Sequence, residues 1–258
     1  MMNPYALMAV TLLASTPLAH GDALSLIQDA ARNSDDAMVT ETTEASPWFF
    51  IGALGGGAMF DSDFKGEDDL SVKYNPGIGL NLGVGYALNK HWAVEISTGL
   101  AWNGIDRISG FVNSTGVSLT ASGGNGNLYQ VPLIASIAWA TPLGDRFTLG
   151  IAAGVGMQWT SFDLHDANLT ANGTPFLTAS QKKNSLAFRY QVGVQITREI
   201  ASNIQLGFGV RFFGTSEVDL GEATFFPTGG GPSFKSTESR KLKNLMGFAL
   251  GTSLKITF

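Results

Sequence analysis

Apolar residues alternate with small or polar residues along the segment from Tyr74 to Trp102. One set of alternate positions holds aliphatic and aromatic side chains, and a short connection at residues 89–91 interrupts it. The other set holds Gly, Asn, Ser and Ala, with Glu95 as its single charge. Because side chains alternate across a strand with a period of two, this pattern predicts a β-hairpin with one strongly apolar face.

The small-residue face decides what surrounds this hairpin. A soluble barrel carries many charged residues on its water-facing side, whereas small polar residues suit a narrow enclosed lumen. The aromatic residues lie at the predicted strand ends, as membrane interfaces require of rings that are part apolar and part polar. We therefore predict a transmembrane hairpin whose apolar face meets lipid. The predicted aromatic belts comprise Tyr74, Tyr86, Trp92, Trp102, Tyr129, Trp139, Phe147 and Trp159.

The same alternation recurs along the rest of the chain and predicts eight strands. They cover residues 48–60, 74–88, 92–102, 128–141, 146–162, 185–197, 204–215 and 245–258. Both faces of the first strand are apolar or small, so the pattern does not set its register. Four longer polar segments are predicted as loops: 61–72, 104–127, 163–184 and 214–241.

Long and short connections alternate strictly between these strands, and no helical period occurs among them. An even number of antiparallel strands with short turns at one end and long loops at the other is the plan of outer-membrane barrels. The predicted fold is all-β: one eight-stranded antiparallel up-and-down transmembrane β-barrel over residues 48–258.

The N-terminal region has a different character. Residues 5–19 form a short apolar stretch followed by small residues, which predicts a cleaved signal peptide over residues 1–23, although no Lys or Arg precedes it. Residues 24–47 are rich in Asp, Glu, Thr and Ala and are predicted to be a polar extension.

Composition narrows the function classes. Only 14% of the residues are charged, the formal net charge is −5, and there is no cysteine. The absence of basic clusters argues against nucleic acid as a partner, and the absence of Cys removes thiolate metal sites. Glycine pairs such as Gly83 and Gly85 lie inside strands rather than at a strand-to-helix turn, so they predict no nucleotide site, and we expect no cofactor.

With these features the chain resembles the small eight-stranded outer-membrane barrels typified by OmpA-, OmpX- and OmpW-like proteins. The last strand carries the most specific local feature, the alternating residues Leu254, Ile256 and Phe258. In that family such an ending is what the barrel-assembly machinery recognises. The resemblance therefore implies an outer-membrane location and two sets of partners: the assembly machinery, and outer-membrane lipids with lipopolysaccharide.

Four charged residues lie well inside the predicted strands, and all four fall on the small-residue face: Glu95, Arg189, Arg211 and Lys255. A charge on the lipid face costs about 2–4 kcal/mol at mid-bilayer, so this placement agrees with a lumen on that side. Since buried charges must pair, we predict that Glu95 pairs with Lys255 or Arg211. The pairs would form an internal plug or, alternatively, part of a gated ion path.

Candidate chemistry is sparse. Asp61 and Asp63, with Gly66, approach a calcium-loop pattern, but Lys65 and Val72 occupy ligand positions, so no metal site is predicted. His91 belongs to a turn beside Trp92. His165 lies between acidic residues with Ser161 nearby, yet no motif of the lipid A-modifying barrel enzymes surrounds it.

We therefore expect a non-enzymatic protein with a structural or surface-interaction role. The long loops carry Phe111, Phe176, Phe225 and Phe226 among Gly, Ser and Thr, and such loops on rigid barrels commonly bind surface ligands. The alternative is a narrow channel for ions or small hydrophobic solutes. A more remote alternative is a lipid A-modifying enzyme.

Overall fold

The structure is a computed structural model that describes residues 47–257 except 67–68, 115–116, 145, 172, 202 and 238. The predicted signal peptide, the predicted polar extension up to residue 46 and Phe258 lie outside the described residues. No helix of the described part is long and apolar enough to cross a membrane.

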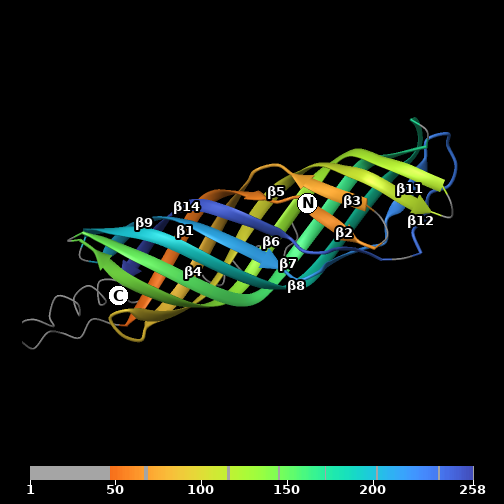
Figure 1. Cartoon of the computed structure of the whole chain (residues 1–258). Coiled ribbons are helices and arrows are strands. Elements are labelled where there is room, and N and C mark those ends of the chain that lie inside the picture. Colours follow the sequence, from red (N-terminus) through yellow and green to blue (C-terminus); the bar gives the residue numbers. More distant parts are fainter. Residues whose placement is uncertain are drawn as a thin grey trace, which may run out of the picture.

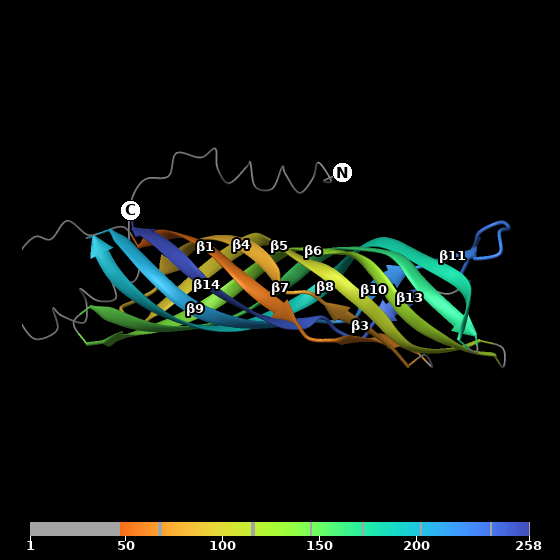
Figure 2. The same ribbon diagram turned by 90° about the horizontal axis from the view of Figure 1, so that it is seen from above.

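Eight antiparallel strands form a closed ring (Figures 1 and 2). In ring order they are β1 (Trp48–Met59), β4 (Gly77–Ala87), β5 (Trp92–Ser114), β6 (Val117–Leu143), β7 (Phe147–Ala171), β8 (Thr174–Ala201), β9 (Ile204–Thr215) and β14 (Met246–Thr257). The ring closes because β14 pairs with both β9 and β1. Closure leaves no open edge among these strands, as a sheet in lipid requires. The predicted eight-stranded barrel is confirmed.

The strands are staggered around the barrel. Backbone pairing that starts at Phe49 passes through Gly85, Glu95 and the following strands and returns to β1 at Met59, ten residues beyond its start. A stagger of this kind requires strongly tilted strands and brings inward-facing residues from distant parts of the chain to one level.

The register of β1, which the sequence left open, is set by these pairings. Phe49, Ile51 and Met59 point inward and are buried, whereas Leu54 points outward and is 62% exposed. The first strand therefore brings large apolar residues into the lumen.

The four predicted loops are wrong, because most of their residues form strands. β5, β6, β7 and β8 are 23 to 28 residues long, about twice the 11 or 12 residues of the other four barrel strands. The remaining loop segments form β2 (Ser62–Lys65), β3 (Asp69–Tyr74), β10 (Val218–Gly221), β11 (Thr224–Pro227), β12 (Phe234–Lys235) and β13 (Arg240–Leu242).

These additional strands continue the barrel on one side, beyond the level at which β1 ends and β4 begins. β3 pairs with β5, β2 with β3, β13 with β2 and β10 with β13. β10 lies against β8, where the Asp219 backbone N–H donates to the Ser185 hydroxyl at 3.2 Å. We call this second ring, with the β11–β12 hairpin at its tip, the extension, and the opposite end of the barrel the turn end (Figure 1).

The extension has an apolar core of its own. Leu128, Phe162, Val218, Leu220, Leu242 and Leu245 are among its fully buried residues. Sequence alternation hid this core because the strands are irregular: β7 shifts register between Leu164 and Ala167, where Asp166 adopts a φ of 57°. Such a bulge breaks the period of two and turns the strand.

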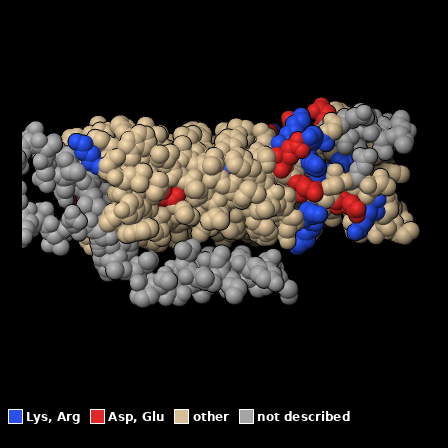
Figure 3. All heavy atoms as spheres, turned by 90° about the horizontal axis from the view of Figure 1, so that it is seen from below, with Lys and Arg blue, Asp and Glu red and all other residues tan. Residues whose placement is uncertain are grey.

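The outer surface divides at the same level. On the face that Figure 3 shows, the wall of the barrel carries few charged side chains, whereas acidic and basic side chains gather on the extension. Exposed aliphatic and aromatic residues cover the charge-free zone, including Leu80, Ile96, Leu133, Val194 and Leu250. This zone is the surface that suits the hydrocarbon region of a bilayer.

Candidate functional site

The interior of the barrel encloses a cavity of about 210 Å³. All eight barrel strands line it, and Gly and Ala are the commonest lining residues. The four charged residues predicted for the lumen, Glu95, Arg189, Arg211 and Lys255, all lie along it. Four strands, β5, β8, β9 and β14, therefore bring these charges into one space.

Phe49 occupies the turn end of this cavity. Its ring lies where a Cβ on Gly85 would stand, and the Lys255 ammonium nitrogen lies 4.1 Å from the ring centroid. Both residues are almost fully buried, as are Gln205 and Thr148 at the same end of their strands. An aromatic ring under an ammonium group is a favourable cation–π arrangement in a desolvated site.

Glu95 lies deeper in the lumen, in the electrostatic field of both Arg211 and Lys255. A Cβ added to Gly83 would stand 2.8 Å from the Glu95 Oε1 atom, so this glycine provides the space for the carboxylate. The structure thus brings Glu95 near both of the partners that the sequence proposed for it.

Arg189 lies at the other end of the cavity and is only 6% exposed. Its Nη1 atom donates to the side-chain oxygens of Gln158 and, at 3.5 Å, Gln130. Its guanidinium carbon lies 4.0 Å above the centre of the Phe213 ring, and its Nε atom is buried without a hydrogen-bond acceptor. This polar layer separates the cavity from the apolar core of the extension.

Sequence reasoning missed the residues that surround Arg189. Gln130 and Gln158 occupy the same alternate positions as the small lumen residues, so a search for amides on that face would have found them. Met59 accepts a hydrogen bond from Gln130 Nε2 through its Sδ atom at 3.5 Å. The sequence did not indicate Met59, because its pattern left the register of β1 undetermined.

Seven of the eight predicted belt residues lie on the outer face at the ends of the charge-free zone. At the turn end Trp48 meets Tyr86 edge-on at 5.0 Å, and Trp92 pairs with Trp139 across strands. At the extension end Trp102 pairs with Tyr129, and its indole N–H donates to Asn127 at 2.8 Å. The other two members at these levels are Phe147 and Trp159.

Tyr74 is the exception, and its assignment to a belt is wrong. It ends β3 rather than beginning the barrel strand, and its ring packs against the apolar core of the extension. Burial raises the pKa of its phenol. Asn75 and Pro76 separate β3 from β4, which the alternation alone did not reveal.

The two histidines among the described residues lie at opposite ends of the protein. His91 lies at the turn end, with Nδ1 3.0 Å from the Ala140 carbonyl oxygen and its ring stacked on Trp139 at 6.5 Å. His165 lies on the surface of the extension, where its Nε2 is 2.9 Å from Asp163, which also pairs with Lys182.

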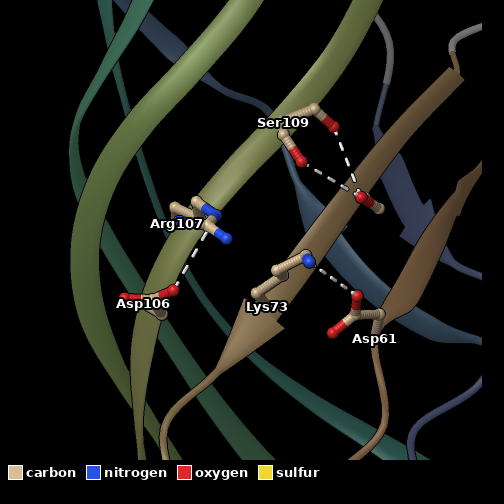
Figure 4. Close-up of polar contacts among 6 residues, drawn as sticks. Asp61, Lys73, Asp106, Arg107 and Ser109 are labelled. Atoms are coloured by element: carbon tan, nitrogen blue, oxygen red, sulfur yellow. Dashed lines mark hydrogen bonds and ion pairs between the residues drawn. The ribbon is translucent and has the colours of Figure 1, made fainter.

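The acidic first loop is a strand edge with ion pairs. Asp61 pairs with Lys73 at 3.4 Å, beside Ser71, whose hydroxyl is 3.4 Å from that of Ser109 (Figure 4). Asp63 pairs with Lys243 at 3.7 Å. Glu67 and Asp68 lie outside the described residues, and the described ones form no cluster of three or more potential metal ligands.

The predicted assembly residues lie at the end of β14. Leu254 and Ile256 face outward between β1 and β9, on the lipid side of the ring. The predicted third member, Phe258, is outside the described residues.

The comparison with protein families fits this architecture. The model of the outer membrane protein beta-barrel domain matches residues 37–229. The chain belongs to this family. The match ends before β14, the strand that closes the ring. Membership establishes an outer-membrane location.

Three solved structures are similar to the chain at low sequence identity. Neisserial surface protein A is 13% identical over 83% of this chain and 99% of its own, with a TM-score of 0.47. OprG from Pseudomonas aeruginosa is 14% identical over 83% and 98%, with a TM-score of 0.48. The outer membrane protease OmpT from Escherichia coli is 12% identical over 85% and 100%, with a TM-score of 0.46. No curated protein sequence matches the chain.

Proposed function

We propose that this outer-membrane protein is non-enzymatic and acts as a rigid surface structure that presents the tip of its extension to partners outside the cell. The observation that carries the proposal is the apolar core of the extension. Residues such as Phe162 and Leu242 fill the space that a solute would have to cross above the cavity. A packed core favours a structural role over conduction.

The tip of the extension supports a binding role. Phe176, Phe226 and Phe234 are each about half exposed or more, and the Phe225 and Phe234 rings lie 5.3 Å apart across the β11–β12 hairpin. Exposed aromatic residues on a rigid support are typical of protein-binding surfaces. We therefore propose that the surface ligand expected for the loops binds at this hairpin and the adjoining part of β8.

Surface display is tested by cysteine labelling, because the chain contains no native cysteine. Phe176→Cys should react with a membrane-impermeant maleimide on intact cells. Lys90→Cys, in a turn at the opposite end, should react only after the outer membrane is permeabilised. Equal labelling of both variants on intact cells would rule out the proposed orientation.

Binding is tested by attachment of expressing cells to wells coated with extracellular-matrix proteins. Replacing Phe176, Phe226 and Phe234 together by Ser should reduce attachment at equal surface expression. The matched control replaces Phe208 by Ser on the membrane-facing wall. Cells that carry this variant correctly assembled in the outer membrane should attach as the parent does. Attachment that is independent of the tip would contradict the proposed role.

The alternative is a narrow channel, and the enclosed cavity beside Glu95 and Arg211 is the observation that favours it. Planar-bilayer recordings of the purified protein separate the two functions. We expect no stable conductance steps. Reproducible ion-selective steps that disappear in Glu95→Ala would establish the channel instead.

A further inference from the structure

The charges that line the barrel cavity are not balanced. Glu95 is the only carboxylate among the residues that line it, whereas Arg189, Arg211 and Lys255 are all cationic. Even without Lys255, the guanidinium groups of Arg189 and Arg211 have only the carboxylate of Glu95 among the lining residues to balance their charge. Gly and Ala are the commonest lining residues, and the polar ones, such as Ser136, Gln191 and Gln195, are neutral and carry no balancing negative charge.

The two arginines lie on adjacent strands and feel each other's charge. Arg211 pairs in register with Gly193, four residues along β8 from Arg189, and both side chains point into the lumen. The charge of Arg211 acts on the guanidinium of Arg189. Like charges in an enclosed space of low dielectric repel strongly unless a counter-charge separates them.

Arg189 also has an unused hydrogen-bond donor. The Nε atom of Arg189 is buried without an acceptor. Arg211 lies in the electrostatic field of Glu95. A guanidinium carries five N–H donors, so the cavity presents several donors and a surplus of positive charge to whatever fills it.

We propose that the lumen binds a small inorganic anion between Arg189 and Arg211. Such an anion would accept charge-assisted hydrogen bonds from both guanidinium groups and balance their charge. The cavity of about 210 Å³ has room for chloride or inorganic phosphate together with water. Glu95 competes with the anion for Arg211, so its charge sets how tightly the anion is held.

The test uses the full chain refolded in detergent. The bulky anion gluconate is replaced stepwise by chloride or phosphate at constant ionic strength. The urea midpoint of unfolding should rise with the concentration of the small anion and then saturate, because a ligand that binds only the folded state stabilises it. Arg211→Met should weaken the apparent affinity at least tenfold. Glu95→Gln should strengthen it.

The matched control is Arg198→Met, which removes an arginine from β8, the strand of Arg189, but on the outer face, over Phe147. This variant should keep the parental response, because general salt effects on unfolding act on all variants alike. An equal anion response in the parent and in Arg211→Met would overturn the proposal.

A second measurement does not depend on any variant. Crystals of the parent protein grown in bromide should show an anomalous peak in the lumen between the two guanidinium groups. Crystals that diffract well enough to locate bromide elsewhere, yet show none in the lumen, would also overturn it.

Discussion

The Lys255 ammonium nitrogen lies 4.1 Å from the centroid of the Phe49 ring, and together the two residues occupy the turn end of the lumen. They come from the two strands that close the barrel, β14 and β1. This contact therefore joins the first and last strands on the inside while backbone pairing joins them in the wall.

Phe49→Ala should lower the free energy of unfolding by about 3–5 kcal/mol, because it removes a buried ring and leaves a void against Gly85. The measurement is urea unfolding of the refolded protein in detergent. Phe50→Ala is the control, since Phe50 faces the lipid side, where detergent replaces the lost contacts. Equal losses for the two variants would contradict the inward position of Phe49.

The charge-free zone predicts how the outer wall responds to a new charge. Leu250→Arg, midway along β14 on the lipid face, should destabilise the inserted barrel by about 2–4 kcal/mol. Phe176→Arg, on the extension, should change stability little because the new charge stays in water. Folding into lipid vesicles at graded urea concentrations measures both, and a large loss for Phe176→Arg would place the tip in the membrane.

The core of the extension should open separately from the membrane-embedded ring. Phe162→Ala removes a ring that is 1% exposed and should cost about 3–5 kcal/mol locally. We expect protease added to intact cells to cleave the extension of this variant faster while the barrel remains inserted. Phe111→Ala, which removes an exposed ring of the extension, should leave the cleavage rate unchanged. Parental resistance in Phe162→Ala would argue against a packed extension.

The carboxylate of Asp219 makes the extension sensitive to acid. It accepts hydrogen bonds from the Ser239 hydroxyl and, at 2.8 Å, from the Gly221 backbone N–H. These bonds, with that of Ser239 contributing most, lower the pKa of Asp219. A carboxyl whose pKa is lower in the folded state stabilises above its ordinary pKa, and this contribution is lost as the pH falls through the folded value.

Ser239→Ala should therefore raise the pKa of Asp219 toward its ordinary value, measured by carboxyl-carbon NMR titration in micelles. Ser185→Ala serves as the control, because Ser185 contacts the backbone N–H of Asp219 and not its carboxylate. A pKa that stays low in Ser239→Ala would show that this hydroxyl is not the cause.

The sequence by itself determined the barrel. The pattern alternates with a period of two, with small residues on one face and apolar residues on the other. This pattern specifies a membrane strand, because odd and even positions along a strand face opposite environments. The inward position of Glu95, Arg189, Arg211 and Lys255 followed from the same parity. These features are local, so they can be read without knowing which strands meet.

Only the tertiary structure decided the extension and the contents of the lumen. The core around Phe162 and Leu242 comes from strands whose period is broken by bulges and short breaks, so its residues meet only after non-local pairing. Tyr74 likewise belongs to the extension because of that pairing. The layer of Arg189, Gln130 and Gln158 depends on the stagger of the barrel, which no single strand contains and which decides which side chains share a level.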